Sequence, residues 1–326
     1  MQLIHLILDN LPSLPPLALT IGNYDGVHLG HQALLLALDR DAKQMGYQSA
    51  VMVFEPQPRE FFTPDDPPAR LTSLAEKAKY IGDLGVDYLI VASFDQAFRS
   101  LSAQDFATLL QGLNVRHLVL GDDFRFGHDR VGDKAFLAAA GFGVDSLHSV
   151  LQDGERISSS LVRKALAAGD LASAKSLLGR AYAITGQVEH GDKIGRTLDF
   201  PTANIAINRI KPALHGVYGA DVIGFVDGRQ IDLASLGKDG QTGVVGMAQG
   251  SLFGAVSVGK RPSVDGQDWR VEVHLPQFTG DLYGIELQVT FTHYLHGERK
   301  YDGLDALKAG ISDDVAQLLK WRDAQG

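Results

Sequence analysis

The chain has 326 residues, which is enough for two domains that each bury a core. Apolar residues make up 45% and charged residues 21%, the balance of an ordinary soluble globular protein. The formal net charge of −9 argues against a nucleic-acid-binding surface, because no basic stripe is available to neutralise phosphates. The sequence has no cysteine, which excludes disulfides and thiolate sites.

The first ten residues, MQLIHLILDN, are apolar but short. They lack a basic leading region, and Asp9, Pro12 and Pro15 interrupt the stretch, so we predict no signal peptide. No apolar run approaches the length of a membrane span. We therefore expect a cytoplasmic protein that contacts neither nucleic acid nor membrane.

Strand and helix signals alternate in the first half of the chain. In order, they predict three strand–helix pairs, two further strands and then two helices, at residues 17–24, 31–45, 49–54, 74–84, 88–93, 105–113, 117–121, 145–151, 159–168 and 171–178. Ser102 is the candidate N-cap of the third helix. Short apolar strands separated by helices are typical of a parallel sheet with helices on both faces.

The pattern changes after about Tyr182. Helical periodicity disappears, and Gly and Pro separate short β-rich runs at residues 183–188, 217–225, 253–258, 269–275 and 287–294. Helical patterns return at 304–309 and 313–322. This order predicts a compact antiparallel β-barrel followed by terminal helices. We expect two domains, residues 1–182 and residues 183–326.

Two histidines flank a glycine in the stretch GNYDGVHLGH, directly after the first predicted strand. His28 and His31 point the same way if a helix begins here, and Gly30 between them lets a ligand approach the backbone. A helix N-terminus at the carboxyl end of a parallel strand suits phosphate. We predict that both imidazoles hydrogen-bond phosphoryl oxygens, with Gly22 and Asn23 in the same binding turn. A solvated helix start with incidental histidines is the alternative.

A second signature, ISSSLVRKAL, spans residues 157–166. Ser159 and Ser160 can cap a helix, and Arg163 can sit one turn inside it and reach a pyrophosphate. In isolation, an ordinary helix cap is the simpler interpretation. With the HxGH stretch, in this order and around a βα domain of this length, it resembles the HxGH nucleotidyltransferases. These enzymes have a Rossmann-like parallel sheet, join the α-phosphate of a nucleoside triphosphate to an acceptor, and release pyrophosphate.

Two further stretches, FEPQPREFF (54–62) and GDDFRFGHDRVGD (121–133), make the resemblance more specific. They are similar to the FMN adenylyltransferase domains of bacterial FAD synthetases. The resemblance implies that Asp123 lies at the nucleotide and flavin site. It also implies that His28 and His31 handle the ATP that adenylylates FMN.

The second half carries its own phosphate signature, GQVEHGDKIGRTLDFPTANI, at residues 186–205. Gly191, Lys193 and Gly195 suit a loop over phosphates. Thr202 and Asn204 are short oxygen-bearing side chains two residues apart, so they can face one side of an extended segment and contribute ligands to Mg²⁺. A Gly-rich hairpin with a surface turn is the alternative interpretation.

A candidate general base lies in RVEVHLPQFTGDLYG, at residues 270–284. Alternation places Val271 and Val273 on one face of a strand, with Glu272 and His274 on the other. A carboxylate that faces a substrate hydroxyl can accept its proton, although a solvent-facing glutamate is the commoner alternative.

These stretches, with GKRPSVDG (259–266) and ERKYDGLDALKAGI (298–311), resemble the riboflavin kinase domain, a small β-barrel with its own Mg·ATP site. The resemblance implies that Thr202 and Asn204 hold Mg²⁺ and that Glu272 activates the ribityl 5′-hydroxyl of riboflavin. Nearly the whole chain therefore resembles the bifunctional riboflavin kinase/FAD synthetases. These convert riboflavin to FMN and FMN to FAD, with one ATP for each step.

Four residues depart from the family pattern, namely Gln57, Asp199, His296 and Gly310. They leave two alternatives: an FMN adenylyltransferase with an impaired kinase barrel, and a flavin-binding regulatory protein. The intact motif residues count against the regulatory alternative. Nothing in the sequence indicates an oligomeric state.

Overall fold

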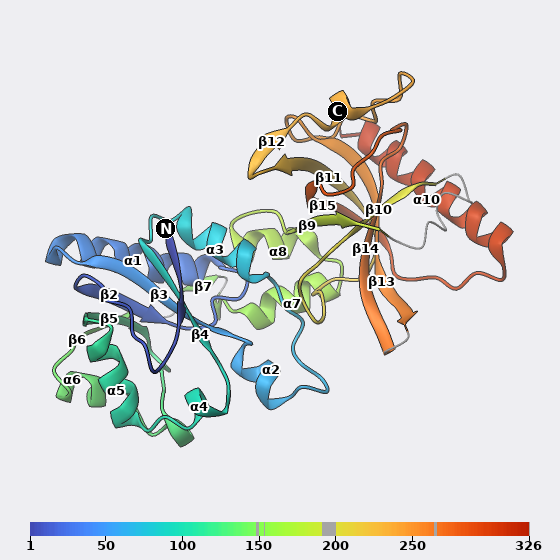
Figure 1. The fold of residues 1–326 in the computed structure, drawn as a ribbon. Helices are drawn as coiled ribbons and strands as arrows, with labels where there is room; N and C mark the ends of the chain where they lie inside the picture. The colour runs from blue at the N-terminus through green and yellow to red at the C-terminus, as the bar shows by residue number, and fades with distance from the viewer. Residues whose placement is uncertain (148–149, 153, 191–199, 264–265, 326) are drawn as a thin grey trace. The chain divides into compact units, whose positions relative to one another are not determined.

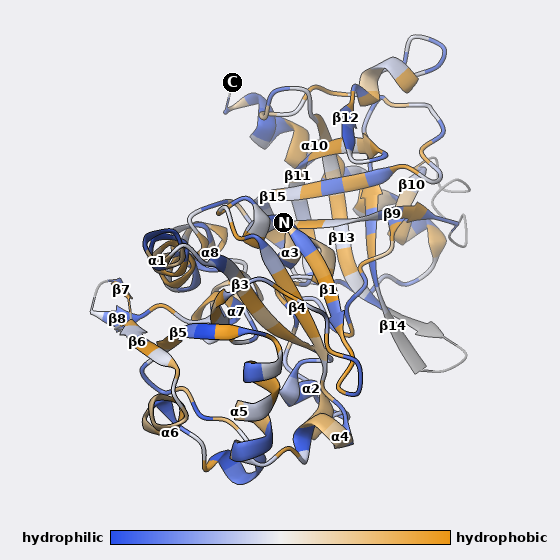
Figure 2. Cartoon of the chain, turned by 60° about the vertical axis from the view of Figure 1, so that its left-hand side comes forward, coloured by the Kyte–Doolittle hydropathy of each residue, from blue (hydrophilic) through white to orange (hydrophobic). Residues whose placement is uncertain are grey.

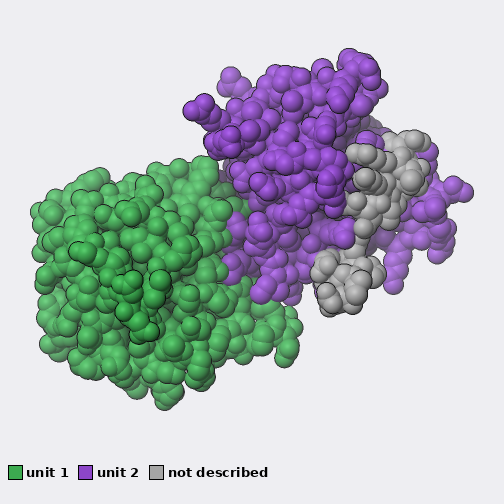
Figure 3. All heavy atoms as spheres, in the orientation of Figure 1, with its two compact units in different colours: residues 1–68, 74–159 green, residues 69–73, 160–326 purple. Residues whose placement is uncertain are grey.

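The computed structural model describes the chain except residues 148–149, 153, 191–199, 264–265 and 326 (Figure 1). Contacts between residues divide it into two compact units (Figure 3). Unit 1 comprises Met1–Pro68 and Leu74–Ser159, and unit 2 comprises Ala69–Ser73 and Ser160–Gly326. Each unit buries apolar clusters of its own.

Unit 1 is built on a parallel sheet whose strand order is β1-β4-β3-β2-β5-β6. Its strands are β1 (Gln2–Leu6), β2 (Leu17–Ile21), β3 (Gln48–Glu55), β4 (Tyr88–Ser93), β5 (Val115–Gly121) and β6 (Gly143–Leu147). Its helices are α1 (Leu29–Met45), α2 (Pro58–Phe62), α3 (Leu74–Gly82), α4 (Gln96–Arg99), α5 (Ala103–Gly112) and α6 (Lys134–Ala139), with a 3₁₀ turn at His128–Arg130. A small hairpin joins β7 (Leu151–Gln152) and β8 (Glu155–Arg156).

Both faces of this sheet are covered, as the sequence predicts. In β2, Leu17 and Leu19 join one buried cluster, which includes residues of α5, whereas Ala18 joins another, which includes residues of α1. Successive side chains of a strand point to opposite faces, so a strand buried on both sides reads as a continuous apolar run. Figure 2 shows this apolar character along β3 and β4. Ser102 is the N-cap of α5, as predicted.

The strand order reverses direction between β2 and β5. From β2 the chain adds β3 and β4 on one side of the sheet, and it later adds β5 and β6 on the other side. Ligands of such sheets bind beyond the carboxyl ends of the strands at this reversal. The GNYDGVHLGH stretch follows β2 and the GDDF stretch follows β5, so both leave the same edge of the sheet.

Unit 2 contains a closed antiparallel barrel. The ring runs β11-β13-β14-β10-β9-β15 and closes because β15 also pairs with β11, while β12 pairs with β11 outside the ring. The strands are β9 (Ala183–Glu189), β10 (Thr202–Ile205), β11 (Gly216–Val226), β12 (Arg229–Ile231), β13 (Leu252–Ser263), β14 (Gly266–His274) and β15 (Glu286–His296). The helices are α7 (Ser159–Ala167), α8 (Leu171–Leu178) and α10 (Leu304–Asp323), with a 3₁₀ turn at Leu233–Leu236.

Helices α7 and α8 pack with the barrel. Val162, Leu166 and Leu178 belong to the same buried cluster as the barrel strands. The compact units therefore divide at Ser159, whereas the sequence places the functional boundary between residues 182 and 183. That functional boundary stays a prediction.

The predicted helices at 304–309 and 313–322 are one helix, α10. Glycine disfavours the interior of a helix, but Gly310 lies within α10. A Cβ at this position would overlap the Tyr301 ring, so the glycine makes room for an aromatic side chain rather than ending the helix. Among the described residues, none of the helices is long and apolar enough to cross a membrane.

Candidate active sites

The turn that follows β2 carries Gly22 and Asn23 and leads into α1. Tyr24 has a positive φ of 49°, and its buried hydroxyl lies 2.6 Å from Oγ1 of Thr20 on β2. Burial raises the pKa of Tyr24 far above its usual range, so the hydroxyl stays protonated. This hydrogen bond fixes the path of the turn toward the first helix.

His28 is the N-cap of α1, and His31 lies in its first turn. The backbone N–H of His31 donates to Nδ1 of His28 over 3.3 Å. A neutral imidazole whose Nδ1 accepts carries its proton on Nε2, so Nε2 of His28 is a donor. The two rings stack with centroids 3.6 Å apart, which holds both imidazoles on one side of the helix start.

Gly30 and Ser159 place this helix start against residues 157–159. A Cβ at Gly30 would lie 3.2 Å from Nδ1 of His28 and 3.5 Å from the Ile157 carbonyl oxygen, closer to the ring than side chains normally approach. Oγ of Ser159 donates to the Asp25 carbonyl oxygen over 2.9 Å. The structure thus brings Ser159 to the HxGH turn, although the two are far apart in the sequence.

Asp123 follows β5, the strand next to β2. Nη1 and Nη2 of Arg156 contact its two carboxylate oxygens over 3.2 and 3.4 Å. Hydrogen bonding to Arg156 lowers the pKa of Asp123 below its usual range, so the carboxylate stays charged. Arg156 was not predicted, because a partner 33 residues away leaves no local pattern in the sequence.

Gln57, which departs from the family pattern, is a further candidate for contact with a ligand in unit 1. It is buried at the N-cap of α2, directly beyond the end of β3. Its backbone N–H donates to Oε2 of Glu60 over 2.9 Å, but its side-chain Nε2 has no hydrogen-bond partner among the described residues. A buried donor of this kind costs free energy unless a ligand satisfies it, so Gln57 is a candidate ligand contact.

Two predicted pyrophosphate contacts lie in unit 2. Ser160 and Arg163 are on α7, and Nε of Arg163 donates to the Ala69 carbonyl oxygen over 2.6 Å. Both the helix and its partner segment therefore belong to the same unit as the barrel.

The barrel register brings the predicted kinase residues onto neighbouring strands. Thr202 on β10 pairs with His274 on β14, and Asn204 pairs with Glu272. Residues directly opposite each other on antiparallel strands share a face, with Cβ atoms about 5 Å apart. Their neighbour Val273 is buried in the core, so these four polar side chains face away from it.

Asn204 has a carboxylate on either side, because it pairs with Glu189 on β9 as well as with Glu272 on β14. Its Oδ1 atom is buried and has no hydrogen-bond partner among the residues described. Amide and carboxylate oxygens are ligands that Mg²⁺ accepts, so an orphaned oxygen between two carboxylates fits a magnesium site. In β9, Glu189 follows the buried Val188, so its side chain points to the opposite face of the strand. Only the pairing of β9 with β10 places Glu189 beside Asn204.

His274 holds the chain that enters β10. Its Nδ1 lies 3.0 Å from the Pro201 carbonyl oxygen, which can only accept, so the ring nitrogen donates. Burial lowers the pKa of His274, and the bond to Pro201 offsets this in part. The neutral ring thereby fixes the residue directly before Thr202.

Three predicted phosphate-loop residues, Gly191, Lys193 and Gly195, lie outside the described residues, and so does Asp199. His296, another departure from the family pattern, joins the end of β15 to α10. Its Nε2 lies 2.7 Å from Oδ1 of Asp314, which is buried. The histidine at this position therefore connects β15 to α10.

Comparison with known proteins follows the division seen in the two candidate sites. A family model for FAD synthetase matches residues 12–161, and one for riboflavin kinase matches residues 178–322. The bifunctional riboflavin kinase/FMN adenylyltransferase of Pseudomonas fluorescens is 45% identical, over 97% of this chain and 96% of its own length. This chain belongs to the bifunctional riboflavin kinase/FMN adenylyltransferase family. The Escherichia coli K12 member is 42% identical over 91% of this chain and 90% of its own length.

Family membership confirms the predicted resemblance and the predicted pair of folds. A crystal structure described as a macrolide-efflux protein from Streptococcus pneumoniae aligns with 98% of this chain and 99% of its own, at 26% identity and a TM-score of 0.75. An α/β unit and a barrel of this kind therefore occur together in another chain of similar fold.

Proposed function

We propose that this chain phosphorylates riboflavin to FMN at the barrel and adenylylates FMN to FAD at the HxGH turn, with ATP as the donor in both steps. The observation that carries this proposal is the presence of both candidate sites in one chain, which a relative named for both activities matches over 97% of its length. We assign adenylyl transfer to residues 1–182 and phosphoryl transfer to residues 183–326, following the sequence boundary.

At the HxGH turn, an oxygen of the FMN phosphate attacks the α-phosphorus of ATP, and the bond to the pyrophosphate oxygen breaks. His28 donates its Nε2–H to a phosphoryl oxygen, and His31 contributes the second imidazole, so charge on the transferring phosphate meets fixed donors. Gly22, Asn23 and Gly30 belong to the turn against which the phosphates bind.

The remaining contacts of the adenylyl site follow the family resemblance. Asp123, held in its charged form by Arg156, lies at the nucleotide and flavin site. Ser159, Ser160 and Arg163 bind the pyrophosphate. The contact of Ser159 with the HxGH turn supports its part in this assignment.

At the barrel, Glu272 accepts the proton of the ribityl 5′-hydroxyl as its oxygen attacks the γ-phosphorus of ATP. Thr202 and Asn204 hold Mg²⁺, and Asn204 offers a buried oxygen for it. Bound Mg²⁺ supplies neutralisation of phosphate charge. The partners are thus the small molecules ATP, riboflavin, FMN and FAD, and the cytoplasmic location stays a prediction from the sequence.

One assay tests the proposal. The purified chain is incubated with riboflavin, ATP and MgCl₂, and the flavins are separated by chromatography. We expect FMN first and FAD later, and neither when the divalent metal is chelated. FAD formed only from supplied FMN would indicate an impaired barrel. No product from either flavin would indicate a flavin-binding regulatory protein.

A further inference from the structure

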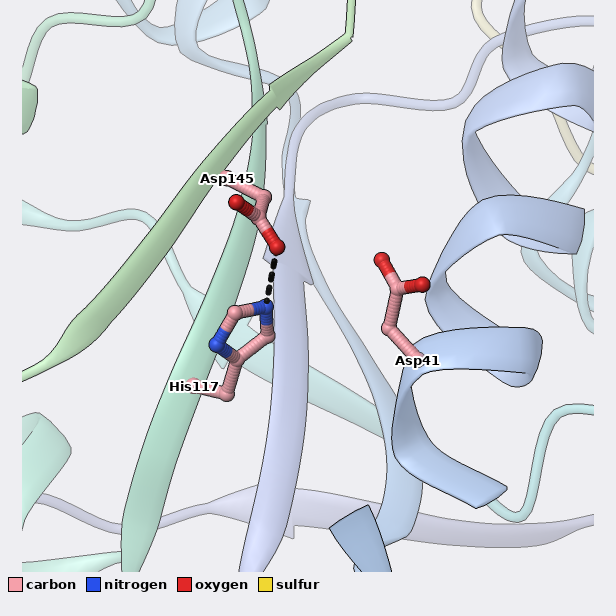
Figure 4. Close-up of side chains that lie close together, drawn as sticks. All are labelled: Asp41, His117 and Asp145. Atoms are coloured by element: carbon pink, nitrogen blue, oxygen red, sulfur yellow. Dashed lines mark ion pairs between the residues drawn. The ribbon is translucent and has the colours of Figure 1, made fainter. Parts of the chain in front are cut away.

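Three side chains from separate elements of unit 1 lie close together (Figure 4). They are Asp41 on α1, His117 on β5 and Asp145 on the edge strand β6. Each offers one ligand atom, and these atoms all lie within 4.8 Å of one another. Asp41 and His117 are buried, whereas Asp145 is exposed.

This His–Asp cluster is separate from the adenylyl site. At 1.5 Å per residue, Asp41 lies about 15 Å along α1 from His31, toward the opposite end of the helix. His117 lies near the amino end of β5, whereas the GDDF stretch that carries Asp123 follows its carboxyl end. Neither predicted reaction uses these three residues.

His117 points to a missing ligand. Its Nε2 lies 3.2 Å from Oδ2 of Asp145, yet this buried nitrogen has no hydrogen-bond partner among the described residues. The ring lies over the neighbouring strand because Gly143 leaves room for it, since a Cβ there would come within 2.6 Å of Nδ1. Nε2 of His117 thus faces a carboxylate without making a hydrogen bond to it, and a cation bound between the two groups would satisfy both.

We propose that Asp41, His117 and Asp145 bind a late first-row divalent cation such as Zn²⁺ or Co²⁺. One imidazole nitrogen with two carboxylate oxygens suits these ions, whereas Mg²⁺ prefers oxygen ligands alone. Three protein ligands leave the fourth position of a tetrahedral ion to water. The ion links α1 to the edge of the sheet and stabilises unit 1.

The three ligand atoms must move slightly closer together to bind one ion. Metal–ligand bonds of about 2.1 Å place tetrahedral donors roughly 3.4 Å apart, whereas the ligand atoms of the cluster lie within 4.8 Å of one another. The Asp145 side chain is 61% exposed, so it can turn inward. Arg40 competes for Asp41, because its Nε and Nη2 lie 2.9 and 2.8 Å from Oδ1, but the Arg40 side chain is 65% exposed and can move away.

The test is a titration of the metal-free full chain with Co²⁺, without nucleotide, followed by visible absorption. We expect saturable d–d bands at one Co²⁺ per chain. Asp145→Asn should weaken binding about tenfold or more, and His117→Gln should abolish the bands. Zn²⁺ should raise the Tm of the wild type more than the Tm of Asp145→Asn.

The control is His128→Gln. His128 Nδ1 lies 3.0 Å from Oδ2 of Asp129, so it is an exposed histidine–aspartate pair of the same unit without a third ligand in the cluster. This variant should bind Co²⁺ as the wild type does. Absence of saturable bands in the wild type would overturn the proposal, and so would equal binding by Asp145→Asn. Because Asp145 is exposed, that variant should stay folded, which circular dichroism checks.

Discussion

His28 and His31 lie in one turn of α1, so a single truncation there tests whether imidazoles support adenylyl transfer. We expect His31→Ala to slow FAD formation about 10²–10³-fold, because it removes one preorganised donor from the transferring phosphate. Phosphorylation of riboflavin should continue, so FMN accumulates. The measurement is the ratio of FMN to FAD at a fixed time.

A melting curve and His128→Ala, an exposed histidine of the same unit, serve as controls for this variant. The double variant of His28 and His31 should lose less than the product of the single losses, because residues that act as a unit are not additive. An unchanged FMN-to-FAD ratio in folded His31→Ala would show that the ring is only part of a helix start.

Glu272→Gln keeps the side-chain volume and removes the proposed base. We expect riboflavin phosphorylation to fall about 10²–10⁴-fold, while adenylylation of supplied FMN stays nearly unchanged. Glu286→Gln, on β15 of the same barrel, is the matched control and should retain both activities. Near-normal FMN formation by Glu272→Gln would mean that this carboxylate is an ordinary strand residue.

The pKa of His274 gives a pH dependence of stability. Burial lowers this pKa in the folded barrel, and an unfolded histidine has a pKa of about 6.5. Between these two pKa values the unfolded chain binds more protons than the folded chain. The stability that the neutral His274 contributes is therefore complete above about pH 6.5 and is lost as pH falls toward the folded pKa. We expect Tm to fall more steeply from pH 7.5 to 5.5 in the wild type than in His274→Asn. Parallel curves would contradict this assignment.

At the scale of elements, strand β9 depends on a close approach of backbones. A Cβ at Gly186 would overlap the Ala206 carbonyl oxygen, which follows β10. We expect Gly186→Ala to destabilise the barrel by about 1–3 kcal/mol or more and to reduce kinase activity, because β10 carries Thr202 and Asn204. Urea denaturation measures the loss. Gly297→Ala, whose Cβ would make only an ordinary 3.6 Å contact, should change stability little; equal losses would rule out the steric explanation.

Many of the elements could be predicted from local pattern, whereas short ones such as α2, α4 and α6 and the pairing of strands could not. The short apolar run at residues 17–21 has the length and continuous hydrophobicity of a buried parallel strand, and it forms β2. Residues 2–6 have no strict alternation, so the edge strand β1 was missed. The neighbours of Asn204 depend on register, which the sequence does not display; Glu189 and Arg156 were missed for the same reason.

At the scale of the molecule, residues 160–182 pack with the barrel, although the sequence boundary assigns them to the adenylyl region. We expect a fragment of residues 160–326 to fold and form FMN. A fragment of residues 183–326 should have a clearly lower Tm, because it lacks the buried side chains of α7 and α8 and Tyr182. Equal Tm values for the two fragments would show that these helices add nothing to the barrel.

The short segment Ala69–Ser73 shows why such a boundary is hard to predict. It belongs to unit 2, and the Leu71 carbonyl oxygen accepts from Nη1 of Arg209 and from the hydroxyl of Tyr182, each over 3.0 Å. A buried arginine needs such acceptors, but the Leu71 carbonyl lies 138 residues from Arg209 and 111 residues from Tyr182 in the sequence. Motifs identify both reactions, whereas long-range contacts decide which unit holds each segment.

The central claim is that separate residues of one chain make FMN and then adenylylate it. The most direct measurement is FAD formed from riboflavin by His31→Ala, by Glu272→Gln, and by an equimolar mixture of the two variants. We predict that His31→Ala stops at FMN, that Glu272→Gln leaves riboflavin unchanged, and that the mixture forms FAD. A mixture that makes no more FAD than either variant alone would contradict the account.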